Sequence, residues 1–180
     1  GLSLVIGTAV VQALQECGLK DIKLKWPNDI VYHNRKLAGI LIELKNPPKP
    51  GFSSVVIGIG LNLYHPTTNP CAINQAITDI HAIQALPPQR NRLAGLLLKS
   101  SLMALSEFQR NDFSSFIEVW HKLDSLKDKC IQIETAKESQ EGIARGVNVQ
   151  GQLCVDIDGK QHCFNSGEVR IRHNRFSKNC

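Results

Sequence analysis

Apolar residues at the start of the chain recur at the three- and four-residue spacing of an amphipathic helix. Gly18 follows the last of them, in the position where a glycine commonly ends a helix. The spacing therefore predicts a helix over residues 2–17 that buries one broad face in a core. The residues on that face are Leu2, Val5, Ile6, Ala9, Val10, Ala13 and Leu14.

The next apolar segments have the pattern of strands. Residues 21–25 alternate, with Ile22 and Leu24 on one face and two lysines on the other. Residues 25–43 carry β-branched runs on both sides of a polar turn at residues 33–36, which predicts a β-hairpin. The hairpin sets lysines and an Asn-Asp pair against strongly apolar strands. Because charges are rarely buried unless they are paired or bind a ligand, this hairpin is the first candidate site.

Residues 53–63 form a third apolar run, SSVVIGIGLNL, which predicts a strand buried on both faces. Gly58 and Gly60 alternate and therefore share one face, and Asn62 follows them on that face. Paired glycines leave a groove for a flat ligand or for a closely crossing helix, and the pattern alone leaves both open. An amide at the end of such a groove is able to read a base edge or to cap a turn.

Two further helices are predicted in the middle of the chain. Residues 91–110 are amphipathic, and Asp112 is placed to cap a second helix that runs to about residue 123. We expect the side chains of Met103 and Trp120 to lie in the core.

After residue 124 the pattern changes to short strands spaced by about ten residues. Asp158-Gly159 is a strong signal for a two-residue hairpin turn. We therefore predict an α+β fold. A mixed β-sheet domain flanked by helices spans residues 1–124, and a small SH3-like β-barrel spans residues 125–180. The five segments read as strands of the barrel are IQIET, EGIARGVN, QLCVDI, KQHCFN and EVRIR.

Composition narrows the classes of function. The 180 residues are 42% apolar, which supports a folded core, and the formal net charge of +5 is modest. No concentrated basic face is present, so nucleic-acid binding is not predicted. No apolar run is long enough to span a membrane, and the first residues do not resemble a signal peptide.

The six cysteines are scattered and none forms a CxxC pair. We therefore expect reduced thiols in a cytoplasmic protein. Cys154 and Cys163, even with His162 beside them, match no common zinc-ligand spacing.

Three motifs, in this order and spacing, resemble the bacterial biotin protein ligases. They are KWPND at residues 25–29, RKLAGIL at residues 35–41 and GIGLN at residues 58–62. The opening GLSLVIG segment and the late GIARGVNVQG segment are similar to that family as well, so the resemblance covers nearly the whole chain. It implies an ATP-dependent reaction in which biotin is converted to biotinyl-5′-adenylate. The biotinyl group is then transferred to one lysine of a biotin carboxyl carrier protein.

The resemblance also implies roles for particular residues. Lys36 is the principal catalytic residue, beside the biotin carboxylate and the α-phosphate, where an ammonium group offsets the repulsion of two anions. Asp29 lies at the phosphates, where a carboxylate either holds Mg²⁺ or helps to deprotonate the acceptor lysine. The biotin-binding residues implied are Lys36, Gly39, Leu41, Gly58 and Leu61, and those for ATP are Lys25, Asp29, Lys36 and Asn62.

The chain also departs from the family pattern. The GRGRRG-type loop that closes over biotin in the family does not occur in it, and neither do the Ser-Thr-Asn biotin contacts or a helix-turn-helix. We therefore expect the chain to be the C-terminal portion of a longer ligase, with no contact to DNA through these residues. The alternatives are a truncated or non-catalytic module that binds nucleotide or biotin, and a lipoate ligase relative, which the KWPND motif disfavours. Members of the family often form homodimers through a sheet edge, which the resemblance extends to this chain.

Overall fold

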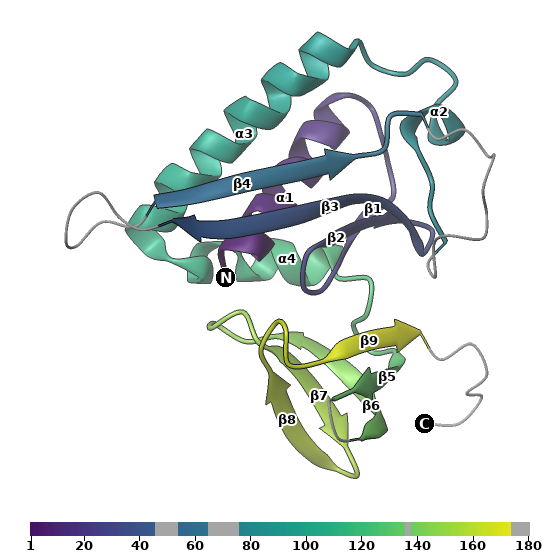
Figure 1. Cartoon of the computed structure of the whole chain (residues 1–180), viewed down its shortest axis with the longest axis vertical. Coiled ribbons are helices and arrows are strands. Elements are labelled where there is room, and N and C mark those ends of the chain that lie inside the picture. Colours follow the sequence, from purple (N-terminus) through teal and green to yellow (C-terminus); the bar gives the residue numbers. More distant parts are fainter. Residues whose placement is uncertain (46–53, 65–75, 136–137, 174–180) are drawn as a thin grey trace.

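The computed structural model describes residues 1–45, 54–64, 76–135 and 138–173. The chain forms two separate β-sheets, with a layer of helices on one side of the first of them (Figure 1). The helices are α1 (Leu2–Glu16), α2 (Ile80–Ile83), α3 (Arg90–Asn111), the 3₁₀ helix η2 (Phe113–Phe116) and α4 (Ile117–Leu123). The strands are β1 (Ile22–Lys25), β2 (Asp29–Tyr32), β3 (Arg35–Lys45), β4 (Ser54–Leu61), β5 (Cys130–Glu134), β6 (Ser139–Val147), β7 (Leu153–Ile157), β8 (Lys160–Phe164) and β9 (Arg170–His173).

The α+β class is confirmed, but the prediction of a mixed sheet is wrong. The first sheet has the order β1-β2-β3-β4 and the second the order β8-β7-β6-β5-β9, and every pairing between these strands is antiparallel. Short hairpin connections explain this arrangement, because parallel neighbours need a long crossover. Within the described ranges, β8 and β9 are the two edges of the second sheet, which is therefore open rather than closed into a barrel.

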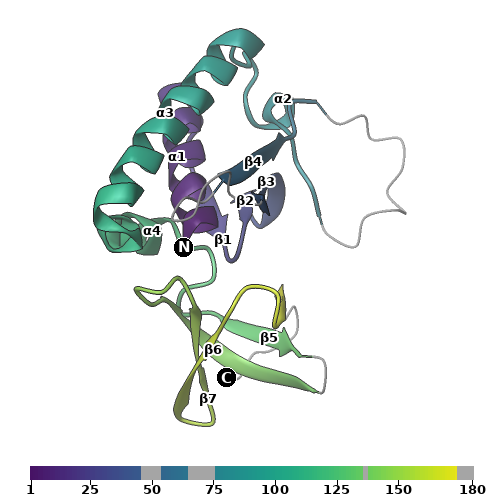
Figure 2. The ribbon, with the colours of Figure 1, turned by 60° about the vertical axis from the view of Figure 1, so that its left-hand side comes forward.

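Helix α1 forms the centre of the first layer, as its apolar spacing predicted. It packs on one face of the first sheet, and α3 packs on the other side of α1 (Figures 1 and 2). Gly7 faces the sheet, and a Cβ there would lie 3.1 Å from Leu24 Cδ2 and 3.7 Å from Ile40 Cδ1. This glycine therefore allows the helix to approach β1 and β3 closely. Gly18 has φ +87° just after the helix, as expected for a glycine that ends one.

The predicted hairpin is confirmed as β2 and β3. His33 and Asn34 form the turn with φ values of 45° and 62°, both in the left-handed region that a tight two-residue turn requires. The turn is shorter than the four residues predicted, and Arg35 and Lys36 therefore belong to β3. This difference matters because it gives Lys36 a fixed position in the sheet.

Strand β4 is not buried on both faces, so that prediction is wrong. It is the edge strand of the first sheet, and its residues alternate between half-buried and exposed. Val56 is 47% exposed, on the same face as Gly58 and Gly60. The apolar run hid this alternation because glycine and valine both count as apolar.

The helices of the middle segment form where the pattern predicted, with two corrections. Trp120 is 1% exposed and belongs to the core, whereas Met103 is 61% exposed on the outer face of α3. Asp112 has φ 53° before η2, and its side chain makes no capping hydrogen bond. Within the described ranges, none of the helices combines the length and apolarity needed to cross a bilayer.

The five strands predicted after residue 124 are all present, and Asp158 and Gly159 form the β7–β8 turn with φ values of 49° and 76°. Cys17, Cys154 and Cys163 are free thiols, as expected. Cys130 is disulfide-bonded, so the prediction of reduced thiols is wrong for that residue.

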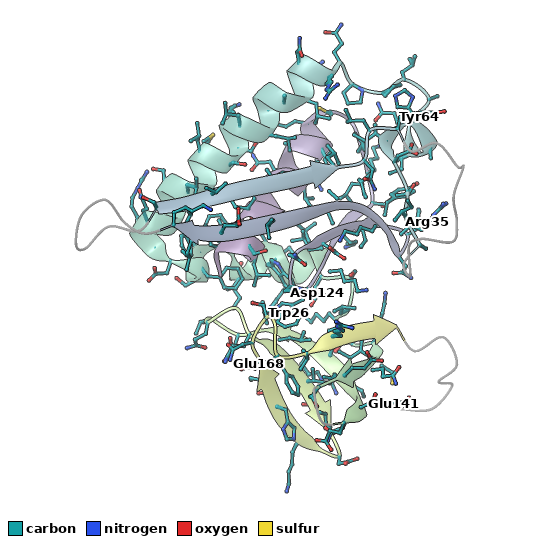
Figure 3. All side chains as sticks on the ribbon, viewed as in Figure 1. Trp26, Arg35, Tyr64, Asp124, Glu141 and Glu168 are labelled. Atoms are coloured by element: carbon teal, nitrogen blue, oxygen red, sulfur yellow. The ribbon has the colours of Figure 1, made fainter. Side chains whose placement is uncertain are left out.

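The two sheets meet through the KWPND segment and the residues that follow α4. The side chain of Trp26 is 2% exposed, and its indole Nε1 donates a hydrogen bond of 3.1 Å to the Gly151 carbonyl. The Ser125 backbone N–H donates to the Leu24 carbonyl at 2.8 Å. Figure 3 shows Trp26 and Asp124 near this junction. The second sheet is therefore tied directly to the start of the predicted site.

Asp124 makes this junction sensitive to pH. Burial raises the pKa of its carboxyl from 3.8 to about 6, against the opposing effects of a hydrogen bond from the Leu126 N–H and the nearby His121. Its Oδ2 is buried and has no hydrogen-bond partner among the described residues. Because the folded state favours the protonated carboxyl, protonation of Asp124 stabilises the fold. This stabilisation is complete below the pKa that the carboxyl has in the unfolded chain, and it is lost as the pH rises through about 6.

We therefore expect a difference between the natural protein and Asp124→Asn in urea titrations. Raising the pH from about 4 to about 7 should lower the free energy of unfolding of the natural protein, relative to the variant, by on the order of 3 kcal/mol. Two curves that stay parallel over this pH range would contradict the burial of a raised-pKa carboxyl at the junction.

Candidate functional site

Four residues form a straight row across the outer face of the first sheet. Lys25 pairs with Asp29, Asp29 with Gly39 and Gly39 with Gly60, so the row crosses β1, β2, β3 and β4 in turn. The side chains of the neighbouring row, which includes Leu24, point to the opposite face of the sheet and are buried against α1. Figures 1 and 2 show that α1, α3 and α4 lie on one side of the sheet, and no described helix or strand covers the other, outer face. This row is therefore the candidate site.

A β-bulge brings Lys36 to this row. The register between β2 and β3 shifts after the Ile30–Ala38 pair, so that Val31 faces Lys36 and Leu37 is the extra residue. Leu37 and Ala38 are consecutive, yet both are buried, at 0% and 1% exposure. A β-bulge allows two consecutive side chains to point to the same face, and it therefore reverses the face to which the side chain before them, that of Lys36, points. As a result, Lys36 Nζ lies 2.5 Å from Asp29 Oδ1, on the outer face.

The backbone of Lys36 is held by a segment that sequence reasoning did not connect with the site. The Lys36 N–H donates to the Ala76 carbonyl, and the Lys36 carbonyl accepts from the Thr78 N–H, each at 2.8 Å. Asn62 Nδ2 donates to the Lys36 and Thr78 carbonyls at 3.4 and 3.0 Å. Thus Asn62 is brought next to Lys36, and its amide hydrogens brace the strand that carries the lysine.

The row concentrates positive charge around one carboxylate. The side chains of Lys36 and Asp29 are 33% and 14% exposed, so the ion pair is partly shielded from water. Burial lowers the pKa of Lys25; the nearby Asp29 raises it and the nearby Lys36 lowers it. With two lysines and one aspartate, the cluster carries an excess of positive charge and is suited to anionic groups.

The floor beside these charges is made of glycines. A Cβ on Gly39 would lie 3.2 Å from both Cε and Nζ of Lys36, so the absence of a side chain there leaves room for the lysine. Gly58 pairs with Leu41 in the next row, and Leu41 is 61% exposed on the same face. Leu61 pairs with Ala38, and its side chain is on the opposite face, against the core. The structure therefore brings Gly39, Leu41 and Gly58 together, but not the side chain of Leu61.

Asn28 is a positioning residue that the sequence prediction missed. Its side chain Nδ2 donates to the Ile40 carbonyl at 2.8 Å, and its own carbonyl accepts from the Ile40 N–H at 2.9 Å. These two bonds fix the start of β2 against β3 and so set Asp29 opposite Gly39. The available signal was the position of Asn28 directly after a proline, where side chains often bond nearby backbone.

Among the cavities lined by described residues, one of the more spacious lies away from this row. A space of about 620 Å³ lies between α1, α3 and α4 and is lined by residues such as Gln12, Met103 and Val119, with neither Lys36 nor Asp29. A smaller hollow of about 230 Å³ adjoins the row at Asn28 and Leu41. Ligand pockets usually span about 300–1,000 Å³. Among the described residues, the candidate site is therefore a charged face of the sheet with a hollow of about 230 Å³ beside it.

Comparisons with known proteins relate the chain to one family. Residues 1–62 match the model of the biotin/lipoate A/B protein ligase family. The chain is 32% identical over 173 residues to the bifunctional ligase/repressor BirA of Escherichia coli, covering 96% of the chain and 53% of that relative. It is 30% identical over 172 residues to the biotin–[acetyl-CoA-carboxylase] ligase of Mycobacterium tuberculosis, covering 93% and 61% of the two chains.

A solved structure has the same fold. The biotin protein ligase from Aquifex aeolicus in complex with biotin and ATP superposes with a TM-score of 0.81 at 24% identity, over 96% of this chain and 71% of that one. The chain spans about half the length of the Escherichia coli relative. From the matching family model, the two relatives and the shared fold, the chain belongs to the biotin/lipoate A/B protein ligase family and is a relative of the biotin protein ligases.

Proposed function

We propose that this chain carries out the ATP-dependent ligation of biotin to a specific lysine of a biotin carboxyl carrier protein, through biotinyl-5′-AMP. The observation that carries the proposal is the cluster of Lys25, Asp29 and Lys36 on the uncovered, glycine-floored face of the first sheet. Family membership supports the same chemistry.

In the first step, a carboxylate oxygen of biotin attacks the α-phosphorus of ATP, and pyrophosphate leaves. Both reactants are anionic. The Lys36 ammonium would lie between them, reducing their repulsion and stabilising the charge that develops on the phosphoryl oxygens. The partial burial of the Lys36–Asp29 pair supports this role, because electrostatic interactions strengthen where water is excluded.

In the second step, the amine of the acceptor lysine attacks the acyl carbon of biotinyl-5′-AMP, and AMP leaves as the amide bond forms. The acceptor amine must lose a proton, and the Asp29 carboxylate would lie beside the reacting groups and accept it. Asp29 is also the residue that would hold Mg²⁺, a cation usually bound by one or two carboxylates together with the phosphates of its substrate. The described residues hold no group of three or more His, Cys, Asp or Glu side chains arranged for a metal, which fits a metal held largely by the nucleotide.

The proposed roles of the other site residues depend on the face of the sheet to which their side chains point. Gly39, Leu41 and Gly58 would line the biotin slot on the outer face, and Leu61 would contribute through its backbone. Lys25 would contact the phosphates, because the cluster of two lysines and one aspartate carries an excess of positive charge. Asn62 uses its amide hydrogens to brace Lys36, so its contact with adenine would use the Oδ1 acceptor.

We further propose that residues 1–124 form the catalytic domain and that residues 125–180 form an SH3-like domain. The open five-stranded sheet of β5–β9 supports the second assignment. A cytoplasmic location and a homodimer formed through a sheet edge belong to the same proposal.

The test is biotin labelling of a carrier domain by the full natural protein, followed by blotting with streptavidin. Label that requires both ATP and biotin supports the ligase function. The absence of label, with biotin and ATP each bound in calorimetry, would instead support a non-catalytic binding module. Transfer of lipoate but not biotin would show a lipoate ligase, which the family model also includes.

Gly39→Ala is expected to lower ligase activity without unfolding the protein. The new methyl group would lie 3.2 Å from Lys36 Nζ and would displace the flexible end of that side chain from its position next to Asp29. Misplacement of a reacting group by about 1 Å is enough to lower a rate by about 100-fold. The measurement is the initial rate of carrier labelling at saturating substrates.

Gly95→Ala is the matched control, because a Cβ there meets nothing within 4 Å on α3. It should keep the natural rate and gain slightly in stability, since alanine favours helix over glycine. Equal rates for Gly39→Ala and the natural protein would show that the position of the ammonium group is not critical.

A further inference from the structure

Two free thiols face each other across the β7–β8 hairpin. Cys154 and Cys163 are directly opposite in the antiparallel register, and their Sγ atoms are 3.1 Å apart. The ligase chemistry uses neither residue.

The tight turn of this hairpin decides the geometry of the pair. A two-residue turn at Asp158 and Gly159 makes the flanking residues, Ile157 and Lys160, a hydrogen-bonded pair. Pairs alternate along an antiparallel ladder, so three positions further on Cys154 and Cys163 form a non-hydrogen-bonded pair. The Cα atoms of such a pair are about 4.5 Å apart, within the range of about 4.4–6.8 Å that a disulfide spans. The backbone is therefore already set for a bond between the two sulfur atoms.

The two thiols differ in their access to solvent. Cys163 is exposed on the edge strand, whereas Cys154 is 8% exposed. Burial, followed by the hydrogen bond with Cys163, raises the pKa of Cys154 to about 12. Since the thiolate is the form that attacks a disulfide, the exposed Cys163 is the residue that reacts first with a reagent from solution.

We propose that Cys154 and Cys163 are a reversible disulfide site that exchanges with small-molecule disulfides of the glutathione type. The Cys163 thiolate attacks one sulfur of the small disulfide, forming a mixed disulfide and releasing one small thiol. Cys154 then loses its proton to water and attacks Cys163 Sγ, which releases the second small thiol. The two protein thiols are oxidised and the small disulfide is reduced to two thiols, so electrons and protons balance. An excess of small thiol reverses both steps.

The other described cysteines do not offer this arrangement. Cys17 lies after α1 and is a free thiol, and Cys130 is already disulfide-bonded. The proposed bond would fasten the edge strand β8 to β7 through two positions that already pair. The proposal does not depend on the ligase function, and its test needs neither biotin nor ATP.

The sequence makes the product easy to identify. Trypsin cuts after Arg145, Lys160 and Arg170, so residues 146–160 contain Cys154 as their only cysteine and residues 161–170 contain only Cys163. The folded protein is incubated with oxidised glutathione, its remaining thiols are alkylated, and it is digested without reduction. We expect mass spectrometry to find the two peptides linked, with the loss of two hydrogen atoms and of both thiols. Dithiothreitol should separate them.

Three comparisons make the result decisive. Cys163→Ser should abolish the linked peptide and leave Cys154 reduced, because the exposed partner is gone. Cys17→Ser should form the linked peptide as the natural protein does. Protein unfolded in urea should lose the preference for this pair. A stable glutathione adduct on Cys163 alone, a link to another cysteine, or two unreacted thiols would each overturn the proposal.

Discussion

Lys36→Ala is expected to lower the rate of adenylate formation by about 100- to 1,000-fold, the usual effect of removing one group that stabilises transition-state charge. The reason is local. Lys36 Nζ lies 2.5 Å from Asp29 Oδ1 on the open face of the sheet, where it would also meet the biotin carboxylate and the α-phosphate. The measurement is biotin-dependent exchange of labelled pyrophosphate into ATP, which follows the first step without a carrier protein.

One further variant separates the charge of Lys36 from its geometry, and a second serves as a control. Lys36→Arg keeps the charge but replaces a compact ammonium with a planar fork, so partial activity is expected. Lys99→Ala removes an exposed lysine on α3, far from the row, and should keep the natural rate. Exchange that survives Lys36→Ala at the natural rate would refute the role assigned to this residue.

A double-mutant cycle tests whether Lys36 and Asp29 act together. Asp29→Asn removes the carboxylate charge while keeping the size of the side chain. If the two residues act as a pair, the double variant should lose much less activity than the sum of the two single losses in free energy. Additive losses would show that each residue acts alone, although their side chains are in contact.

Trp26→Ala is expected to lower the free energy of unfolding by about 3–5 kcal/mol, the usual range for truncating a buried aromatic side chain. Trp26 is 2% exposed and lies where the first sheet meets the second (Figure 3). Its loss would leave a cavity and remove the indole hydrogen bond to Gly151. Urea denaturation followed by far-UV circular dichroism measures the change, and Trp120 remains as a fluorescent probe of the core.

Trp26→Phe separates the hydrogen bond from the packing. It keeps an aromatic ring but leaves the Gly151 carbonyl without its donor, so a smaller loss of about 1–3 kcal/mol is expected. Leu98→Ala is the control for a large apolar residue that is 63% exposed, and it should change stability by less than about 0.5 kcal/mol. If Trp26→Ala were as mild as the control, the indole would not be a structural link between the sheets.

Periodicity predicted most helices and strands because each element keeps one face against a core. The spacing of apolar residues located α1, and Asp158-Gly159 located the β7–β8 turn. The same reasoning failed where apolar residues stay in solvent. Met103 lies on the outer face of α3, and β4 is a half-exposed edge strand, because hydrophobic character alone does not say which elements are available to cover a face.

The sequence by itself determined the family, through motifs whose order and spacing are specific. Through the same resemblance it predicted that Lys36 and Asp29 are catalytic residues. Simple alternation along β3 would have separated Lys36 from Gly39 and placed it on the face of Ala38. Only the tertiary structure decided otherwise. A bulge at Leu37 buries two consecutive residues, which turns the lysine toward Asp29, and backbone hydrogen bonds from residues 76–78 hold it there. Such a shift depends on contacts between segments about 40 residues apart in the chain, which no local pattern contains.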